Sequence, residues 1–491
     1  MSADSPVQTG GSLGERARSD DDRAAIASAH SLLARQRAAF GQNMNPSLDA
    51  RLHDLEKLAT LLLSNREAIA SAISADFGNR SRHESLLAEV FVTLKGIRET
   101  QKALGGWMKP RARRLEWLFQ PGRAEIIPQP LGVIGILSPW NYPVQLALAP
   151  LTAALAAGNR AMLKPSELTP KTSLLMKQLL SQAFSEDKVA VIVGGPLVGE
   201  AFAGLDFDHL IFTGSTRVGR LVMRAAAETL TPVTLELGGK SPVLIHDDAP
   251  LEDTALRVMT GKLFNAGQTC IAPDYALVPR GQRNAWAAAF RSAAMKLYPR
   301  LESNPDYTHI INDRQLARLR GALDEARAGG ATVYEVNPAG EALAPSSRVL
   351  APHVVVDAPL DGALMQDEIF GPILPVVPYD SFDDALGFIN ARPRPLALYS
   401  FGRSEARHQR VLRGTVAGGV TVNETLLHVG VDDLPFGGVG PSGMGRYHGQ
   451  AGFDGLSQLK PVFHQYAPNA TALLRPPFGR ALEGLLKVLL R

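Results

Sequence analysis

The sequence has one cysteine in 491 residues, and this scarcity excludes several classes of protein. A single thiol cannot form an internal disulfide, a CxxC redox pair, a cysteine-rich zinc site or a self-supplied iron–sulfur cage. The thiol is therefore either a small buried hydrophobic group or a chemically used nucleophile. A chain of this length is expected to form two or three domains with a sizeable core.

Long apolar runs, strong net charge and metal-binding motifs are also missing. No segment reaches the ~18 apolar residues that a membrane span needs, and the longest apolar stretch, 146–157, predicts a buried helix. The net charge of +3 is too small to argue for nucleic acid binding. The eleven histidines are scattered without an HExxH motif, so we expect no metal site.

The N-terminal residues are rich in Ser, Gly, Asp and Arg, and they contain no apolar segment of the kind found in secretory signals. We expect residues 1–27 to be disordered because this composition cannot bury a core. A cytoplasmic location is the default expectation.

Short apolar strands alternate with helices from residue 133 onward. Strands are expected at 133–137, 160–164, 189–193 and 209–213, and helices at 144–157, 171–184 and 218–229. Such alternation predicts a parallel doubly wound sheet, whose ligands lie beyond the carboxyl ends of the strands. A second alternating block at about 232–414 predicts a second domain and a cleft between the two. Two outlying strands, 123–130 and 420–423, are expected to form an interdomain or intersubunit sheet.

The one cysteine, Cys270, ends the polar segment Gly267-Gln-Thr-Cys270 and is followed by Pro273. A lone cysteine is more often a buried hydrophobic residue than a nucleophile. A cysteine in the hydrophobic core would not need polar neighbours, so this polar segment favours the interpretation of Cys270 as a nucleophile.

Two further residues suit the chemistry of a thiol nucleophile. Glu236 lies inside an otherwise apolar strand, where burial raises the pKa of a carboxyl group and makes it a usable general base. The alternative is a structural ion pair with Lys240. Asn141 follows the first strand and is suited to donate a hydrogen bond to a developing oxyanion, unless it is only a turn residue.

Two segments suit a dinucleotide. Gly214–Gly219 follows the strand 209–213 and opens a helix, which suits a phosphate group, although a plain strand-to-helix turn explains it equally well. Lys164–Glu167 follows another strand and carries side chains for ribose hydroxyls or phosphate, with a surface turn as the alternative. By contrast, Gly438–Gly443 matches GxGxxG but follows no strand, so we expect a loop and not a dinucleotide site.

Together and in order, these motifs closely resemble the aldehyde dehydrogenase superfamily over about residues 48–463. The form of the segment 270–275 resembles the class 3 branch, and the segments 107–110, 141–143 and 443–449 are most similar to coniferyl aldehyde dehydrogenases. The motifs that carry the resemblance are Pro139-Trp-Asn141, Lys164-Pro-Ser-Glu167, Phe212-Thr-Gly-Ser215, Glu236-Leu-Gly-Gly-Lys240, Gly267-Gln-Thr-Cys270, Glu368-Ile-Phe-Gly-Pro372 and Pro435-Phe-Gly-Gly438.

The resemblance implies an α/β fold with a Rossmann-like doubly wound cofactor domain, an α/β catalytic domain and a small β oligomerisation element. The expected boundaries are 28–122 and 131–235 for the cofactor domain, 236–416 for the catalytic domain, 123–130 and 417–463 for the oligomerisation or bridging element, and 464–491 for an amphipathic tail.

The resemblance also implies roles for the motif residues. Cys270 would attack the aldehyde carbon, Asn141 would help to hold the oxyanion, and Glu236 would activate the water that hydrolyses the thioester. Glu368 is a second candidate for that base. NAD is the expected cofactor and NADP a further one, because Glu167 would repel a 2′-phosphate while class 3 relatives often accept both. The residues expected at the cofactor are Ser138, Trp140, Lys164, Ser166, Glu167, Phe212, Gly214, Ser215, Thr216, Gly219, Leu237, Glu368 and Phe370.

The expected reaction is oxidation of coniferaldehyde or a related aromatic aldehyde to the acid, with Tyr142 and Trp140 as candidates for an aromatic wall. A medium- or long-chain aliphatic aldehyde is the alternative substrate. We expect a homodimer. The tail has one apolar helical face with flanking basic residues, which suits a membrane surface, a partner subunit or the substrate mouth; that face contains Leu482, Leu485, Leu486 and Leu489.

Overall fold

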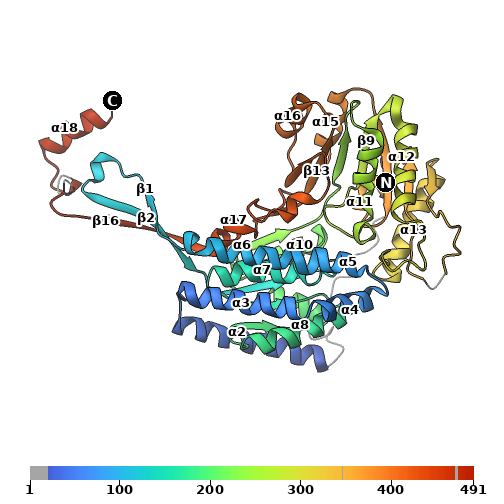
Figure 1. Ribbon diagram of the computed structural model, residues 1–491. Helices are drawn as coiled ribbons and strands as arrows, with labels where there is room; N and C mark the ends of the chain where they lie inside the picture. Colours follow the sequence, from blue (N-terminus) through green and yellow to red (C-terminus); the bar gives the residue numbers. More distant parts are fainter. Residues whose placement is uncertain (1–19, 345–346, 470, 472–473, 491) are drawn as a thin grey trace, which may run out of the picture.

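The computed structural model describes residues 20–344, 347–469, 471 and 474–490. Two large β-sheets with their covering helices form the body, and a third sheet extends from it as a long arm (Figure 1). Within the described residues, no helix combines the length and the apolar character that crossing a membrane requires. The expected α/β architecture is confirmed.

The first sheet, called here the N-terminal sheet, has the strand order β15-β7-β6-β3-β4-β5. All neighbouring strands are parallel except β15, which pairs antiparallel with β7. The direction in which strands are added reverses between β3 and β6, the kind of position where open α/β sheets bind ligands. The strands are β3 (Val133–Leu137), β4 (Arg160–Lys164), β5 (Val189–Val191), β6 (His209–Thr213), β7 (Val233–Glu236) and β15 (Gly443–Met444).

Helices cover both faces of this sheet, which explains why its strands are continuous apolar runs. Alternate strand residues point to opposite faces, so that Ile134 and Val133 join different core clusters. One face is covered by α3 (Leu48–Ser64), α4 (Arg66–Phe77), α6 (Val92–Trp107), α7 (Gln145–Ala156) and α8 (Pro170–Ala183). The other is covered by α2 (Asp20–Gln42), α9 (Pro196–Ala203) and α10 (Thr216–Ala227).

The helix α2 corrects part of the prediction for the N-terminus. It begins at Asp20, so residues 20–27 are helical and not disordered, while residues 1–19 lie outside the described residues. Three aspartates form its first turn, where negative charge favours a helix through the macrodipole. Further along, Ala29, Leu32 and Leu33 are buried against the sheet.

The second sheet has the order β10-β11-β12-β9-β8-β13-β14, and only β10 is antiparallel to its neighbour. Its strands are β8 (Pro242–Ile245), β9 (Tyr275–Pro279), β10 (Thr332–Glu335), β11 (His353–Val356), β12 (Ile373–Tyr379), β13 (Ala397–Phe401) and β14 (Gly419–Val422). Its helices are α11 (Leu251–Leu263) and α12 (Arg283–Leu297) on one face, and α13 (Asp313–Ala328), α14 (Ala363–Gln366), α15 (Phe382–Asn390) and α16 (Glu405–Gly414) on the other.

The arm is a three-stranded antiparallel sheet of β1 (Arg111–Arg113), β2 (Gly122–Pro130) and β16 (Ser457–Gln465). The helix α17 (Gly449–Gly455) leads into it, and α18 (Arg480–Leu489) lies at its far end (Figure 1). The expectation that 420–423 would join this sheet is wrong. That segment pairs with β13 as the edge strand β14 of the second sheet, so 417–463 is not one bridging element.

Candidate active site

A cavity of about 210 Å³ lies where residues from the carboxyl ends of the N-terminal sheet meet loops of the second sheet. We call it the Cys270 cavity. Four chemically important residues from separate motifs share it, namely the cysteine, both candidate carboxylates and the asparagine. It is lined by Pro139, Trp140, Asn141, Thr213, Gly214, Ser215, Glu236, Leu237, Gly238, Cys270, Gln315, Arg318, Glu368 and Phe370.

The backbone before Cys270 turns sharply after α11. Residues 265–267 all have positive φ, at 51°, 51° and 75°. A Cβ on Gly267 would stand 2.3 Å from the carbonyl oxygen of Gly371, so only glycine fits there. The side-chain amide of Asn265 donates a hydrogen bond to the backbone oxygen of Asn141 at 3.1 Å. The turn therefore joins the cysteine loop to the loop that carries the candidate oxyanion donor.

The thiol of Cys270 is half-buried and faces two carboxyl groups. Burial, then the negative charge of Glu368, then that of Glu236 raise the pKa of the thiol to about 12. At neutral pH such a thiol is almost wholly protonated. Reaction as a thiolate therefore requires a group that accepts the proton.

Glu236 is the last residue of β7 and is 2% exposed. Neither carboxyl oxygen has a hydrogen-bond partner among the residues that the structure describes. Burial raises the pKa of this group well above its ordinary value, against the opposing charge of Arg446. A buried carboxyl group with free oxygens and a raised pKa is suited to general base catalysis.

The ion pair considered between Glu236 and Lys240 does not form. The Lys240 ammonium instead pairs with Asp274 and donates hydrogen bonds to the backbone oxygens of Leu364 and Asp367, both at 2.8 Å. The Lys240 ammonium is thus bound by the backbone that precedes Glu368, and it does not neutralise the carboxyl group of Glu236.

Glu368 approaches the same cavity from the second sheet. A Cβ on Gly238 would stand 2.1 Å from one of its carboxyl oxygens, so a glycine is required for this approach. Burial, followed by the charge of Asp274, raises the pKa of Glu368 to about 8, while a hydrogen bond from the N–H of Gly239 acts in the opposite direction. Unlike Glu236, this carboxylate therefore has a backbone partner.

Asn141 is 3% exposed, and its side-chain nitrogen donates one hydrogen bond to the backbone oxygen of Gln268 at 3.2 Å. An amide nitrogen carries two hydrogens, so one donor remains for a substrate oxygen. A buried ion pair holds the backbone here. Arg80 lies 2.9 Å from Glu89 and donates to the backbone oxygen of Asn141 at 2.8 Å.

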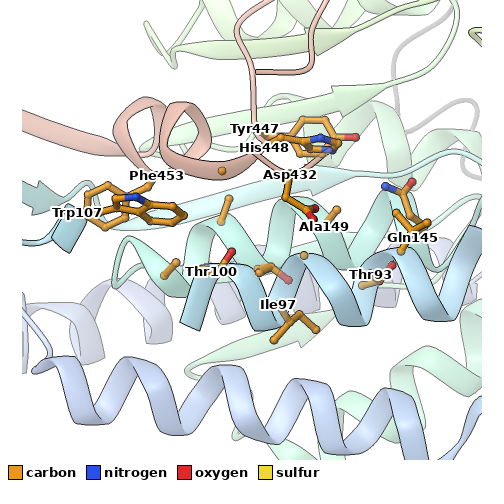
Figure 2. A pocket seen from close by; sticks show the side chains of 16 residues that line it. Thr93, Ile97, Thr100, Trp107, Gln145, Ala149, Asp432, Tyr447, His448 and Phe453 are labelled. Atoms are coloured by element: carbon orange, nitrogen blue, oxygen red, sulfur yellow. The ribbon is translucent and has the colours of Figure 1, made fainter. Parts of the chain in front are cut away.

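A second and narrower cavity, of about 40 Å³, lies between α6, α7 and the segment before α17 (Figure 2). We call it the aromatic cavity. Trp107 and Phe453 lie at one end, with ring centroids 5.7 Å apart, and Tyr447 and His448 lie at the other. The charges of Glu236 and Cys270 contribute to the raised pKa of Tyr447, which burial dominates. Tyr447 thus lines this cavity and is close enough to the reacting groups for their charges to affect its pKa.

The two predicted aromatic wall residues occupy different surroundings. Trp140 lines the Cys270 cavity and packs edge-on against Phe370 at 5.4 Å. Tyr142 lines neither of the two cavities, and its hydroxyl is 2.6 Å from that of Thr269, the residue before the cysteine. Tyr142 therefore braces the cysteine loop.

The remaining cofactor candidates follow the strands of the N-terminal sheet. Lys164 ends β4, is 4% exposed and pairs with Glu167 at 3.2 Å. The Ser138 hydroxyl, just after β3, is buried without a hydrogen-bond partner in the described part of the chain. Ser215 caps α10 by accepting the N–H of Val218 at 3.4 Å. A free hydroxyl, a helix N-terminus and an ammonium–carboxylate pair along one sheet edge fit a dinucleotide.

Among the predicted cofactor residues, the Cys270 cavity takes in Trp140, Gly214, Ser215, Leu237, Glu368 and Phe370. The others lie outside its lining. Phe212 and Leu237 pack closely on the glycines, because a Cβ would stand 2.5 Å from the Phe212 ring at Gly214 and 2.6 Å from Leu237 at Gly219. The Thr216 hydroxyl donates to the backbone oxygen of Pro441, and that of Ser166 accepts the N–H of Leu168.

Sequence reasoning missed Gln315 and Arg318, which line the cavity from α13. Arg318 also donates to the backbone oxygen of Ile369 at 2.6 Å and so fixes the loop of Glu368. Both residues lie on an otherwise ordinary charged helix. No local motif marks them, and only tertiary packing brings them to the site.

Comparisons with known proteins agree with this geometry. A model of the aldehyde dehydrogenase family matches residues 9–462. A Pseudomonas aeruginosa protein named "Probable coniferyl aldehyde dehydrogenase" is 51% identical over 93% of this chain and 94% of its own length. A substrate-bound structure of Staphylococcus aureus AldH is 35% identical with a TM-score of 0.88, covering 94% of this chain and 99% of that one. A Bacillus cereus aldehyde dehydrogenase in complex with NAD⁺ is 27% identical with a TM-score of 0.81, covering 90% and 89%.

Proposed function

This chain belongs to the aldehyde dehydrogenase family and oxidises aldehydes with NAD(P), and from this premise we propose that its substrates are coniferaldehyde and related aromatic aldehydes. The proposal is supported by the identity with the named Pseudomonas protein. It is also supported by the aromatic side chains that line the second cavity, among them Tyr447, whose pKa is affected by the charges of Glu236 and Cys270.

The mechanism that we propose depends on one observation, that Cys270 shares a cavity with two buried carboxyl groups and an amide donor. The Cys270 sulfur attacks the aldehyde carbon and forms a thiohemiacetal, as the thiol proton leaves to a base. The free hydrogen of the Asn141 amide stabilises the negative oxygen. NAD(P), whose nicotinamide side Glu368 and Phe370 would hold, would supply the acceptor for the hydride of the same carbon, and loss of that hydride would leave a thioester on Cys270.

Glu236 is the proposed base for the second half of the reaction. Its oxygens are unpartnered within the described residues, so they are available to hold a water beside the thioester. Glu236 takes one proton from that water as its oxygen bonds to the carbonyl carbon, and the carbon–sulfur bond then breaks as Glu236 returns the proton to the sulfur and the acid is released. Glu368 is the competing candidate, with a carboxylate that already accepts the N–H of Gly239.

NAD is the proposed cofactor, with NADP as a second one. Lys164 and Glu167 would bind the adenosine ribose, Ser215 and the glycines of 214–219 the pyrophosphate, and Glu368 and Phe370 the nicotinamide side. Support comes from their alignment along one sheet edge and from the unpartnered Ser138 hydroxyl there, within the residues described. The cofactor domain would then be 28–122 with 131–235, extended to Asp20 by α2, and the catalytic domain 236–416, extended by the edge strand β14.

The substrate proposal is tested with a panel of kcat/KM values for coniferaldehyde, benzaldehyde, hexanal and dodecanal, each with NAD and NADP. We expect coniferaldehyde to give the highest value. A strong preference for dodecanal would overturn the proposal in favour of aliphatic aldehydes. Cys270→Ser is the matched control: it should lose dehydrogenase turnover but still bind the cofactor, and normal turnover would contradict the mechanism.

We also propose that the chain assembles as a homodimer through the arm. Support comes from exposed aromatic side chains on it, with Trp117 at 64%, Phe119 at 40% and Phe463 at 49% exposure. The helix α18 buries no residue and is a candidate for contact with the partner subunit or with a membrane surface. Sedimentation with anionic lipid vesicles distinguishes the two, because only membrane contact predicts binding that is lost when 466–491 is removed.

A further inference from the structure

A buried glutamate that does not line the Cys270 cavity supports the turn before the cysteine. Glu84 belongs to the short helix α5 (Arg82–Ser85) and is 8% exposed. One of its carboxyl oxygens accepts the backbone N–H of Asn265 at 2.9 Å and the hydroxyl hydrogen of Thr308 at 3.2 Å. Glu84 therefore binds the turn at the first of its residues with positive φ.

The backbone of Asn265 depends on such a partner. Its φ of 51° and ψ of 33° lie in the left-handed region, which a residue with a side chain adopts only at a cost in free energy. Asn265 is fully buried, and a buried N–H without a partner is unfavourable as well. The hydrogen bond to Glu84 therefore stabilises a conformation that the turn would otherwise leave.

The side chain of Asn265 carries this support to the candidate oxyanion donor. Its amide nitrogen donates hydrogen bonds to the backbone oxygens of Asn141 and Gln268, both at 3.1 Å. The same Gln268 oxygen accepts one hydrogen of the Asn141 side chain at 3.2 Å. Asn265 thus holds the Asn141 backbone and also the oxygen that orients the Asn141 amide, which sets the direction of the second hydrogen of that amide.

The chemical form of Glu84 matters less than the position of its oxygen. Burial, opposed by the charge of Arg80, raises the pKa of Glu84 to about 7. The protonated carboxyl group keeps a carbonyl oxygen that accepts the N–H of Asn265, as the carboxylate does. An amide oxygen at this place should therefore support the turn in the same way.

We propose that Glu84 is a positioning residue for the oxyanion, acting through Asn265 on the Asn141 amide. The inference rests on the role proposed for Asn141. An oxyanion donor stabilises the negative oxygen only when its hydrogen points to that oxygen, and a displacement of about 1 Å costs a reaction about 10²-fold in rate. Loss of the Glu84 acceptor should therefore slow the steps that pass through the oxyanion.

The test compares two reactions of the same cysteine. Formation of the first equivalent of NAD(P)H passes through the oxyanion, and stopped-flow absorbance measures its rate with the best aldehyde of the panel above. Alkylation by iodoacetamide without cofactor displaces iodide from a saturated carbon and forms no oxyanion. Burial and the charges of Glu368 and Glu236 raise the pKa of the Cys270 thiol, so a change at Glu84 should leave alkylation unaffected.

Glu84→Met removes the acceptor with little change in side-chain volume. We expect the rate of the first equivalent of NAD(P)H to fall about ten- to hundredfold, and alkylation to stay within about twofold. Glu84→Gln keeps an oxygen in place and should retain the first rate within about threefold. The matched control is Glu67→Met, because Glu67 pairs with Arg82 of α5 but is more than half exposed; it should change neither rate.

A second variant covers the case in which Glu84→Met does not fold. Glu84→Asp keeps the carboxyl group but shortens the side chain by one methylene group, which withdraws the oxygen from the N–H of Asn265. It should also slow the first equivalent of NAD(P)H without slowing alkylation. Equal falls in both rates, no fall in the first rate, or a Glu84→Gln variant as slow as Glu84→Met would overturn the role of Glu84.

Asn141→Ala separates this inference from the proposed function. It should itself slow the first equivalent of NAD(P)H, and Glu84→Met should add little to that loss in the double variant, because both changes act on one donor. Full additivity in the double variant would overturn the inference alone. If Asn141→Ala leaves the rate unchanged, the oxyanion role proposed for Asn141 fails as well.

Discussion

At the scale of single residues, the two carboxyl groups beside Cys270 differ in their own hydrogen bonds. Glu368 accepts the N–H of Gly239, and its pKa is raised to about 8. Glu236 has no partner in the part of the chain that the structure describes, and its pKa is raised well above the ordinary value. This difference favours Glu236 as the group that binds and activates water.

Replacing Glu236 by Gln should separate the two halves of the reaction. Hydrolysis of the thioester is the step that we assign to this base, so we expect one rapid equivalent of NAD(P)H followed by turnover reduced about 10²–10⁴-fold. Stopped-flow absorbance of the reduced cofactor measures both phases. Glu368→Gln is the control and should show no such burst. A burst in Glu368→Gln alone would assign the base role to Glu368.

The reactivity of Cys270 should depend steeply on pH. Because the pKa of the thiol is raised to about 12, the thiolate fraction rises about tenfold per pH unit below that value. We therefore expect the rate of alkylation by iodoacetamide, measured without cofactor, to rise about tenfold from pH 7 to 8 and again to pH 9. A rate independent of pH would contradict the raised pKa.

The same measurement tests the influence of Glu368 on the thiol. With a pKa of about 8, this carboxyl group is mostly neutral at pH 6.5 and charged at pH 9. The Glu368→Gln variant should therefore be alkylated faster than the unmodified protein at pH 9, and at an equal rate at pH 6.5. The exposed Asp361→Asn serves as control and should match the unmodified protein at both values. A constant ratio at both pH values would rule out the charge effect.

The motifs predicted which residue types meet at the site, but not all of their surroundings. Cys270, Glu236, Asn141 and Glu368 lie far apart in the sequence and line one cavity; their chemical roles stay predictions. The contact between the Tyr142 and Thr269 hydroxyls could not be predicted from the sequence, because it depends on how two loops pack together.

At the scale of elements, a π-helix at Leu86–Phe91 carries the carboxylate that fixes the loop of Asn141. Glu89 accepts hydrogen bonds from the backbone N–H groups of Val144 and Gln145, at 3.0 and 2.9 Å, and pairs with Arg80. Both charged side chains are fully buried. The pair therefore joins the π-helix to the start of α7.

Replacing Glu89 by Gln should both destabilise the protein and slow catalysis. The variant removes the carboxylate that contacts the buried Arg80 guanidinium and leaves only the charge interaction with Glu84, so we expect a cost of up to about 3–5 kcal/mol of unfolding free energy. Urea unfolding measures this cost. The double variant Arg80→Met with Glu89→Met should recover part of the stability, because both members of the contacting pair are removed together, but it should not recover kcat, because Asn141 loses its support. Recovery of both would limit the pair to a structural role.

An exposed ion pair provides the control for this experiment. Arg82 and Glu67 lie 2.6 Å apart, but both side chains are more than half exposed. Glu67→Gln should therefore leave the unfolding midpoint and kcat unchanged.

Strand positions were easier to predict than strand partners. The apolar runs at β3, β4 and β6 were predicted with the same limits that the structure has. The segment at β14 was assigned to the wrong sheet, because a short apolar strand carries no local information about its neighbour. The start of α2 was not predicted, because the composition of an Asp-rich segment is typical of disorder. The packing of α2 against α9, which stabilises the helix, is visible only in the structure.

At the scale of the whole molecule, the arm is the part that extends away from the two large sheets and their helices (Figure 1). The rings of Phe119 and Phe463 pack on each other at 6.2 Å while remaining partly exposed. Exposed apolar surface on an extended sheet is typical of an interface between subunits.

Phe463→Asp should therefore break the homodimer that we propose. A charge in a buried apolar interface is costly, so the mass measured by light scattering after size-exclusion chromatography should fall from twice the chain mass to once. Leu230→Asp is the control, because Leu230 is 89% exposed on the body of the molecule and should leave the mass unchanged. A dimer that persists in Phe463→Asp would place the interface elsewhere.

The pairing of β15 with β7 has a consequence for the synthesis of the protein. Gly443 lies directly opposite Glu236 in the antiparallel pairing, more than two hundred positions later, and Arg111 in the arm forms an ion pair with Asp454. A ribosome releases these late partners only near the end of translation. The first sheet is thus incomplete at the residue that we assign as the base until most of the chain has emerged. Contacts between residues so far apart in the sequence form slowly. We therefore expect the hydrophobic core to form during synthesis well before the strand pairing beside Glu236 is complete.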